Sequence, residues 1–154
     1  MILCYRTLYL IEEGNVDLLI INGPNLNLLG YRDDKIYGKE SLEDINTFIK
    51  KQYPDDKIEF FQSNHEGEII DKIQTVREIF QGMIINPGAL AHYSYAIRDA
   101  IEVSTIPVIE VHISNIYKRE KFRQQSVTAP VCSGIISGLG KYSYVLAIEA
   151  LKNK

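Results

Sequence analysis

The sequence predicts an α/β protein with a flavodoxin-like fold: a five-stranded parallel sheet in the order 2-1-3-4-5 with helices on both faces. Two observations support this. Five short runs rich in Ile and Val recur along the 154 residues, mostly without alternation, which is typical of strands buried on both faces of a parallel sheet. Segments with helical periodicity separate the runs, as right-handed crossovers require. The expected strands are residues 16–21, 58–62, 83–85, 107–111 and 131–136.

A polar loop, residues 22–38, follows the first expected strand. It contains Asn22, Asn25, Arg32 and Tyr37 among several glycines and a proline. A loop that only reverses the chain does not need this combination, so we interpret it as functional. An ordinary turn with a solvated Arg and Tyr is the alternative on these residues alone.

Serine-based caps predict where two helices begin. Ser41 and Asp44 form a capping-box pattern ahead of a helix with one apolar face, and Ser63 and Glu66 repeat the S-x-x-E signal ahead of a second helix. Periodicity predicts a third helix over residues 92–103 and a fourth over residues 141–151, with one or two further turns over residues 118–122.

The composition indicates one domain with its own core and without a nucleic-acid surface. The net charge is −3, with 17 basic and 20 acidic residues well mixed, and only residues 118–123 are locally basic. No run reaches the ~18 apolar residues of a membrane helix, and the apolar start has no basic region or cleavage site typical of a signal peptide. Cys4 and Cys132 have no metal-like spacing. We therefore expect a soluble cytoplasmic protein without membrane association, with Cys132 as a small core residue in the fifth strand.

Glu110 and His112 are the strongest candidates for catalytic residues. Side chains that follow the strands of such a sheet meet at its carboxyl edge, where ligands bind. Two residues apart on a strand, Glu110 and His112 point to the same face. A carboxylate beside an imidazole stabilises the protonated ring and orients it, which is how a general acid is made. A purely structural pair is the alternative, and a position at a cleft argues against it.

The other histidines carry weaker signals. His92 and Asp99 are seven residues apart, on one face of the expected third helix, and His92 would lie near its N-terminus, where backbone N–H groups favour an anion. A capping His and a surface Asp are equally compatible with this spacing. His65 is interpreted as a loop or cap residue. The histidines are too dispersed for a metal site, and neither a P-loop nor a dinucleotide fingerprint is present, so no metal or cofactor is expected.

Several separate motifs in order make the chain resemble the type II 3-dehydroquinate dehydratases. They are Asn22-Gly23-Pro24-Asn25-Leu26-Asn27-Leu28-Leu29-Gly30-Tyr31-Arg32, Tyr37-Gly38, Gln62-Ser63-Asn64, Asn86-Pro87-Gly88, Glu110-Val111-His112-Ile113-Ser114-Asn115 and Ser137-Gly138-Leu139-Gly140. The resemblance implies a single catalytic domain over residues 16–154, preceded by an extension, residues 1–15, without counterpart in the family. Asp33-Asp34 stands where the family commonly has Glu-Pro.

The resemblance implies a lyase that converts 3-dehydroquinate to 3-dehydroshikimate by trans loss of water through an enolate, the third step of the shikimate pathway. Tyr37 would be the base, with Arg32 stabilising its tyrosinate, because the ordinary tyrosine pKa of about 10 is too high for a base at neutral pH. Asn25 would hold a donor or water against the enolate oxygen, and His112, oriented by Glu110, would protonate the departing hydroxyl.

The same resemblance implies the substrate-binding residues and the assembly. The expected binding residues are Asn86, His92, Asp99, Ile113, Ser114 and Arg123. Family members form trimers that pack into dodecamers, and Asp99 would reach the site of a neighbouring subunit. The competing class, a flavodoxin-like binding or signalling domain, predicts a phosphate or flavin cradle rich in Ser, Thr and Gly after the first strand, whereas this chain has Asn-Gly-Pro-Asn there. A metal-dependent hydrolase lacks the ligands it would need.

Overall fold

The computed structural model of the protein describes residues 15–31, 38–77 and 79–153. It contains a five-stranded parallel sheet in the order β2-β1-β3-β4-β5, as predicted. The strands are β1 (Asp17–Asn22), β2 (Lys57–Gln62), β3 (Gly82–Asn86), β4 (Val108–His112) and β5 (Gly134–Ser137).

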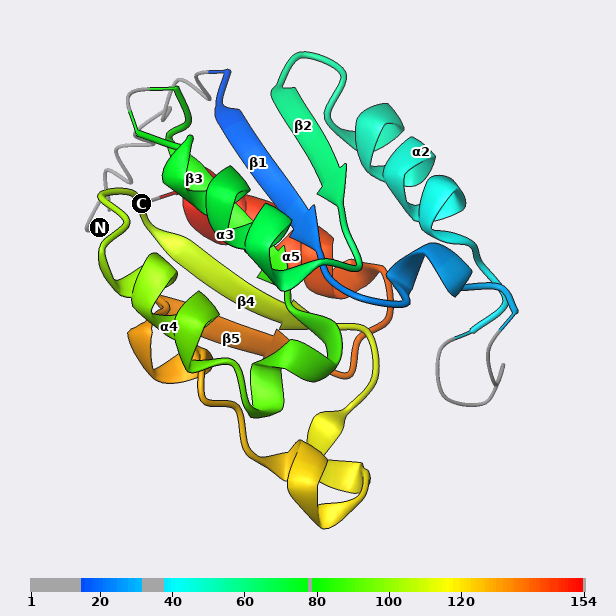
Figure 1. Cartoon of the computed structure of the whole chain (residues 1–154). Coiled ribbons are helices and arrows are strands. Elements are labelled where there is room, and N and C mark those ends of the chain that lie inside the picture. The colour runs from blue at the N-terminus through cyan, green and yellow to red at the C-terminus, as the bar shows by residue number, and fades with distance from the viewer. Residues whose placement is uncertain (1–14, 32–37, 78, 154) are drawn as a thin grey trace, which may run out of the picture.

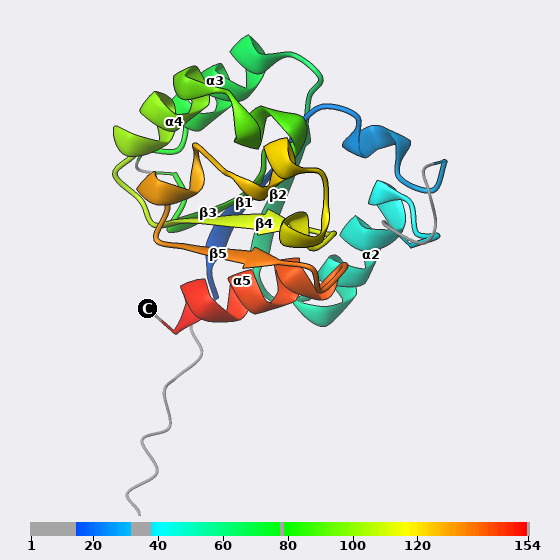
Figure 2. The same ribbon diagram turned by 90° about the horizontal axis from the view of Figure 1, so that it is seen from below.

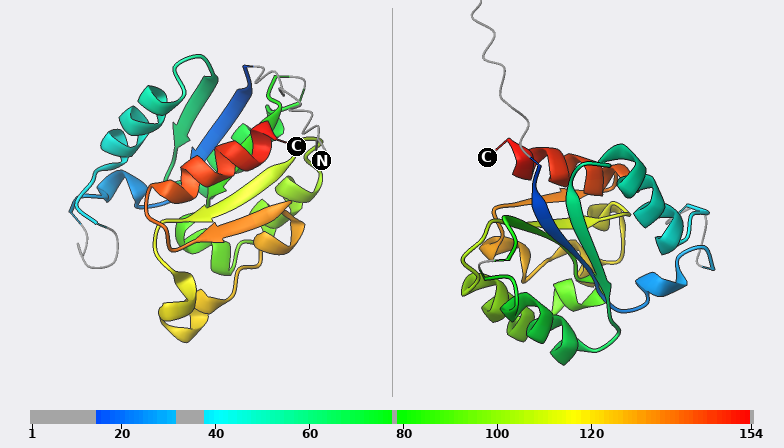
Figure 3. Two further views of the ribbon diagram at one scale, coloured as in Figure 1. Left: turned by 180° about the vertical axis from the view of Figure 1, so that it is seen from behind. Right: turned by 90° about the horizontal axis from the view of Figure 1, so that it is seen from above.

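Helices cover both faces of the sheet (Figure 1). Their bounds are α2 (Leu42–Gln52), α3 (Glu66–Gln74), α4 (Tyr95–Glu102) and α5 (Tyr142–Lys152). Seen along the layers, α3 and α4 lie on one side of the sheet and α2 and α5 on the other (Figure 2). The view from behind shows α5 lying over the sheet (Figure 3). Within the described ranges, no helix combines the length and apolar character that crossing a membrane requires.

The two faces of β1 supply two separate apolar cores. Leu18 and Ile20 pack with residues of α2 and α5, while Leu19 and Ile21 pack with residues of α3 and α4. This division follows from the period of two along a strand. Because β1, β3 and β4 are covered on both faces, the residues between their ends are apolar, apart from Glu110 in β4.

The predicted start of α2 is confirmed. The Ser41 hydroxyl accepts the Asp44 N–H at 3.1 Å, and the Asp44 carboxylate accepts the Ser41 N–H at 2.9 Å, which completes a capping box. The second signal works differently. The Ser63 hydroxyl accepts the N–H of His65 and donates to Glu68, so it orders the turn before α3 without capping it.

The third helix begins later than predicted. Residues Gly88–His92 form a 3₁₀ helix, and α4 starts at Tyr95 because the Ser94 hydroxyl accepts the Ile97 N–H as its N-terminal cap. His92 therefore lies at the end of the preceding turn. It does not share a helix face with Asp99, which corrects the spacing argument made from the sequence.

The fifth strand also differs from its prediction. Residues Ala129–Val131 form a 3₁₀ turn in which the carbonyl groups of Thr128 and Ala129 accept the N–H groups of Val131 and Cys132. Those N–H groups cannot pair with β4, so the strand begins at Gly134. As an edge strand it is partly exposed, and Cys132 lies outside it, half-buried against the core of α3 and α4. The expectation that β5 is buried on both faces was wrong.

Candidate active site

A small polar pocket lies at the carboxyl ends of β1, β3 and β4. Its volume is about 160 Å³, and it brings together seven residues that the sequence singled out: Asn25, Asn86, His92, His112, Ile113, Ser114 and Arg123. They come from segments separated by up to a hundred residues of sequence. Arg119, from the basic cluster at residues 118–123, also lines the pocket.

Glu110 and His112 form the expected pair at the end of β4. His112 Nε2 lies 2.7 Å from Glu110 Oε1, and both side chains are almost completely buried. Two further donors hold the carboxylate: the Ser126 hydroxyl donates to Oε1 at 2.7 Å and the Thr128 hydroxyl to Oε2 at 2.5 Å. The three donors fix the orientation of the Glu110 carboxylate against the His112 ring.

His92 enters the pocket as a neutral hydrogen-bond acceptor. Its Nδ1 lies 2.7 Å from the carbonyl oxygen of Gln125, which can only accept, so Nδ1 carries the proton. Burial lowers the pKa of His92, an effect that the carbonyl of Gln125 partly opposes. Its Nε2 lone pair is consequently available to a donor in the pocket. The His92 ring is nearly parallel to that of His112, with 6.4 Å between centroids.

Asn25 occupies a strained position that the neighbouring loop holds in place. It is the one non-glycine residue with positive φ, 66°, in the described part of the chain. Its N–H donates to Asn64 Oδ1 at 2.8 Å, and Gln62 Nε2 contacts the same oxygen at 3.2 Å. Non-glycine residues in this conformation concentrate at functional sites, where surrounding contacts impose it.

The turns after β1 and β3 interlock beneath the pocket. The Gly23 N–H donates to the backbone oxygen of Asn86 at 2.8 Å. A Cβ at Gly23 would lie 2.4 Å from the oxygen of Pro87, so only glycine allows this approach. The two motifs with Asn, Gly and Pro are therefore one packed unit that sets the positions of Asn25 and Asn86.

The end of β4 is held by the loop between β5 and α5. The N–H groups of Gly138 and Gly140 donate to the carbonyl groups of His112 and Ile113. The Ser137 hydroxyl donates to the carbonyl of Ser114 at 3.1 Å. These bonds fix the backbone of the segment that carries His112 and Ser114, and they explain the strand-end motif Ser-Gly-Leu-Gly.

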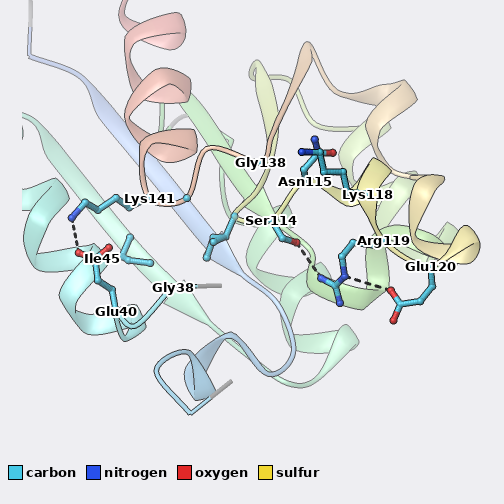
Figure 4. Close-up of a pocket in the computed structure, with 12 residues that line it drawn as sticks. Gly38, Glu40, Ile45, Ser114, Asn115, Lys118, Arg119, Glu120, Gly138 and Lys141 are labelled. Atoms are coloured by element: carbon cyan, nitrogen blue, oxygen red, sulfur yellow. Dashed lines mark hydrogen bonds and ion pairs between the residues drawn. The ribbon is translucent and has the colours of Figure 1, made fainter. Parts of the chain in front are cut away.

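A larger cavity of about 690 Å³ adjoins the pocket, with Ile113, Ser114 and Arg119 in both linings. Figure 4 shows Arg119 between Ser114 and Glu120: Nη1 donates to the Ser114 hydroxyl at 3.2 Å, and Nε lies 3.4 Å from Glu120 Oε2. On the far side, Lys141 pairs with Glu40. Gly38 also lines this cavity, so the described segment that begins at residue 38 starts beside the site.

Four of the predicted residues do not line the described pocket, and one of them, Glu110, reaches it only through its contact with His112. Arg32 and Tyr37 lie outside the described residues. Asp99 is exposed on α4 and does not line the pocket. In the part of the chain that the structure describes, no cluster of three or more His, Cys, Asp or Glu could hold a metal ion.

Sequence reasoning missed Ser126, Thr128 and Arg119. Ser126 and Thr128 lie in a segment without periodicity, 16 and 18 residues after Glu110, and only tertiary packing brings them to its carboxylate. From the sequence, Arg119 stands out only as one member of the locally basic cluster at residues 118–123. Burial raises the pKa of the nearby Cys132 thiol to about 12, with the charge of Glu110 adding to the effect, so Cys132 is not a nucleophile.

Comparisons with known proteins identify the family to which the chain is similar. The family model described as Dehydroquinase class II matches residues 16–152. The 3-dehydroquinate dehydratase of Thermotoga petrophila is 57% identical over 139 residues, which cover 89% of this chain and 95% of the relative. That of Caldicellulosiruptor bescii is 59% identical over 138 residues, covering 88% and 95%. The crystal structure of a type II dehydroquinase from Butyrivibrio crossotus aligns with a TM-score of 0.86 and 51% identity, covering 91% of this chain and 99% of that one.

Proposed function

The chain belongs to the class II dehydroquinase family and is a 3-dehydroquinate dehydratase of the shikimate pathway, and we propose that Tyr37 and His112 are its base and acid. The reaction is a trans elimination. Tyr37, as tyrosinate, takes the proton alpha to the ketone. The electron pair of the broken C–H bond forms a double bond to the carbonyl carbon, and the carbonyl π pair moves onto oxygen to give an enolate. The enolate then collapses, the hydroxyl beta to the ketone leaves, and His112 supplies the proton that makes it water.

His112 is suited to this role by its surroundings. Because Nε2 is bound to Glu110, Nδ1 is the ring nitrogen that gives the proton to the departing hydroxyl. The negative charge of Glu110 favours the imidazolium that the acid must be before the step. Ser126 and Thr128 hold the Glu110 carboxylate in position beside the ring.

The base half of the mechanism is assigned to Arg32 and Tyr37. A cationic guanidinium beside the phenol favours the tyrosinate, the form that accepts the proton. Asn25 places a donor or a bound water against the oxygen on which the enolate charge develops. Its imposed backbone conformation supports this, since a preorganised donor stabilises a transition state without reorganising.

The remaining pocket residues bind the substrate. Ile113 and Ser114 present backbone and hydroxyl groups to its carboxylate, and Arg123 supplies a cation. Asn86 donates to a substrate oxygen, and His92 accepts from a ring hydroxyl through Nε2. The pocket is thus matched to a small polyhydroxylated carboxylate.

We further propose that the active form is a dodecamer built from trimers and located in the cytoplasm, with residues 1–15 as an extension outside the catalytic domain. In this assembly Asp99 completes the site of a neighbouring subunit. Its exposure on α4 is compatible with that role. Light scattering coupled to gel filtration tests the assembly: the expected mass is twelve times 17.6 kDa.

The assignment rests on the buried Glu110–His112 pair. Its His112 lines a pocket together with six other residues that were predicted from the sequence. Purified protein mixed with 3-dehydroquinate should produce the absorbance of a conjugated enone. Tyr37→Phe and His112→Ala should each lower kcat by orders of magnitude with ligand binding largely intact, because each removes an interaction made in the transition state.

Tyr31→Phe is the matched control, since it removes a phenol that is 90% exposed in the same loop, and it should leave kcat unchanged. Exchange of the alpha proton with deuterated solvent isolates the first step. If Tyr37→Phe exchanged that proton at the wild-type rate, Tyr37 would not be the base.

A further inference from the structure

Two asparagines end neighbouring strands side by side. Asn22 at the end of β1 pairs in register with Asn86 at the end of β3. By the period of two, both continue the series of Leu18, Ile20 and Ile84, which pack on the side of α5. Their amides consequently point toward α5, at an otherwise apolar interface.

Tyr144 of α5 joins the two amides. It is fully buried, and its hydroxyl donates to Asn22 Oδ1 at 2.6 Å and accepts from Asn86 Nδ2 at 3.0 Å. A phenol has a single proton, which here goes to Asn22, so its oxygen faces Asn86 as an acceptor. Burial raises the pKa of Tyr144 far above its ordinary value, so the hydroxyl keeps its proton at neutral pH.

The Asn86 amide is thereby fixed at both ends. The Gly88 N–H donates to Asn86 Oδ1 at 3.2 Å, while the Nδ2 group donates to Tyr144. If the amide turned over, its NH₂ would face the Gly88 N–H and its oxygen would face a hydroxyl whose proton points away. The fixed orientation leaves the second Nδ2–H of Asn86, which lines the pocket, for a ligand oxygen.

We propose that Tyr144 is a positioning residue for substrate binding: together with Asn22 it fixes the Asn86 amide so that a hydrogen-bond donor always faces the pocket. This rests on the proposed function, in which Asn86 donates to a substrate oxygen. Tyr144 does not touch the substrate. Its effect passes through Asn86 alone, and this distinguishes it from a core tyrosine that only stabilises the fold.

The test is a double-mutant cycle on substrate turnover. Tyr144→Phe frees the Asn86 amide and should raise KM by about three- to tenfold, the size of one neutral hydrogen bond, with little change in kcat. Asn86→Ala should raise KM at least as much. The double variant should have the KM of Asn86→Ala, because Tyr144 has nothing left to position. Asn22→Ala removes the acceptor of the phenol proton while keeping the ring in the core, and it should behave in the same way.

Tyr53→Phe is the matched control. The Tyr53 hydroxyl donates to Glu149 of α5, the helix that also carries Tyr144, but neither Tyr53 nor Glu149 lines the pocket. The substitution should therefore leave KM unchanged. If Tyr144→Phe leaves KM at the wild-type value, or multiplies KM further in the Asn86→Ala background, the positioning role is overturned. Failure of the wild-type protein to dehydrate 3-dehydroquinate would instead refute the proposed function, so the two failures are distinguishable.

Discussion

Replacing Glu110 with Gln tests the centre of the proposed acid. The substitution keeps the size and shape of the side chain and removes its charge. The Gln oxygen can accept from His112 and Ser126, and its NH₂ can donate to the Thr128 hydroxyl, which rotates to accept. The geometry of the site is therefore preserved, and the experiment isolates the charge.

The expected magnitude follows from the distance and burial of the pair. At 2.7 Å and an effective dielectric constant of about 20, two unit charges attract by about 6 kcal/mol. Desolvation offsets part of this, and removing one partner of a buried pair costs about 3–5 kcal/mol. Because every 1.36 kcal/mol is a factor of ten in rate, kcat should fall by about 10²- to 10⁴-fold.

The assay is the initial rate of enone formation at saturating 3-dehydroquinate, with thermal unfolding measured on the same samples. Glu149→Gln, the same chemical change at an exposed carboxylate on α5, is the control and should leave kcat unchanged. A folded Glu110→Gln enzyme with kcat within about threefold of wild type would refute the charge argument.

Three further outcomes are expected. Thr128→Val removes a donor to the Glu110 carboxylate without changing shape, so urea denaturation should show a loss of about 1.5–3 kcal/mol; an unchanged midpoint would contradict this. Because burial lowers the pKa of His92 below its ordinary value of about 6.5, protonation below that pH favours the unfolded state and converts the Nε2 acceptor into a donor. KM should therefore rise as pH falls through the lowered pKa, and His92→Asn should abolish that rise; an identical rise in both enzymes would exclude His92. Asp99→Ala should raise KM or reduce the mass seen by light scattering, and a variant with neither change would not support its place in a neighbouring site.

The sheet could be predicted because burial on both faces leaves a signal in the sequence itself. The central strands β1 and β3 are apolar between their end residues, β4 is interrupted only by Glu110, and the Ser41 capping box marks α2 locally. Competition between local motifs was not predictable. The start of α4 depends on Ser94 capping it after a 3₁₀ turn, and the start of β5 depends on which carbonyl groups accept the preceding N–H groups.

The sequence predicts those site residues that the topology of the sheet or the resemblance to a known family places there. Parallel strands place their ends together, which brings Asn86 to His112, and the period of two pairs Glu110 with His112. Ser126 and Thr128 are different, because no pattern indicates that a segment between two strands turns its hydroxyls toward a buried carboxylate. Such contacts depend on how the whole chain packs.

The two polar networks of the site come from opposite faces of the sheet. Glu110 and His112 continue the series of Val108, which faces the core of α3 and α4, whereas Asn86 continues the series of Ile84, which faces α5. The strands end between them, so the pocket receives the acid from one face and a binding amide from the other. In the proposed mechanism, groups from opposite faces of the sheet therefore bind and protonate a substrate at this edge.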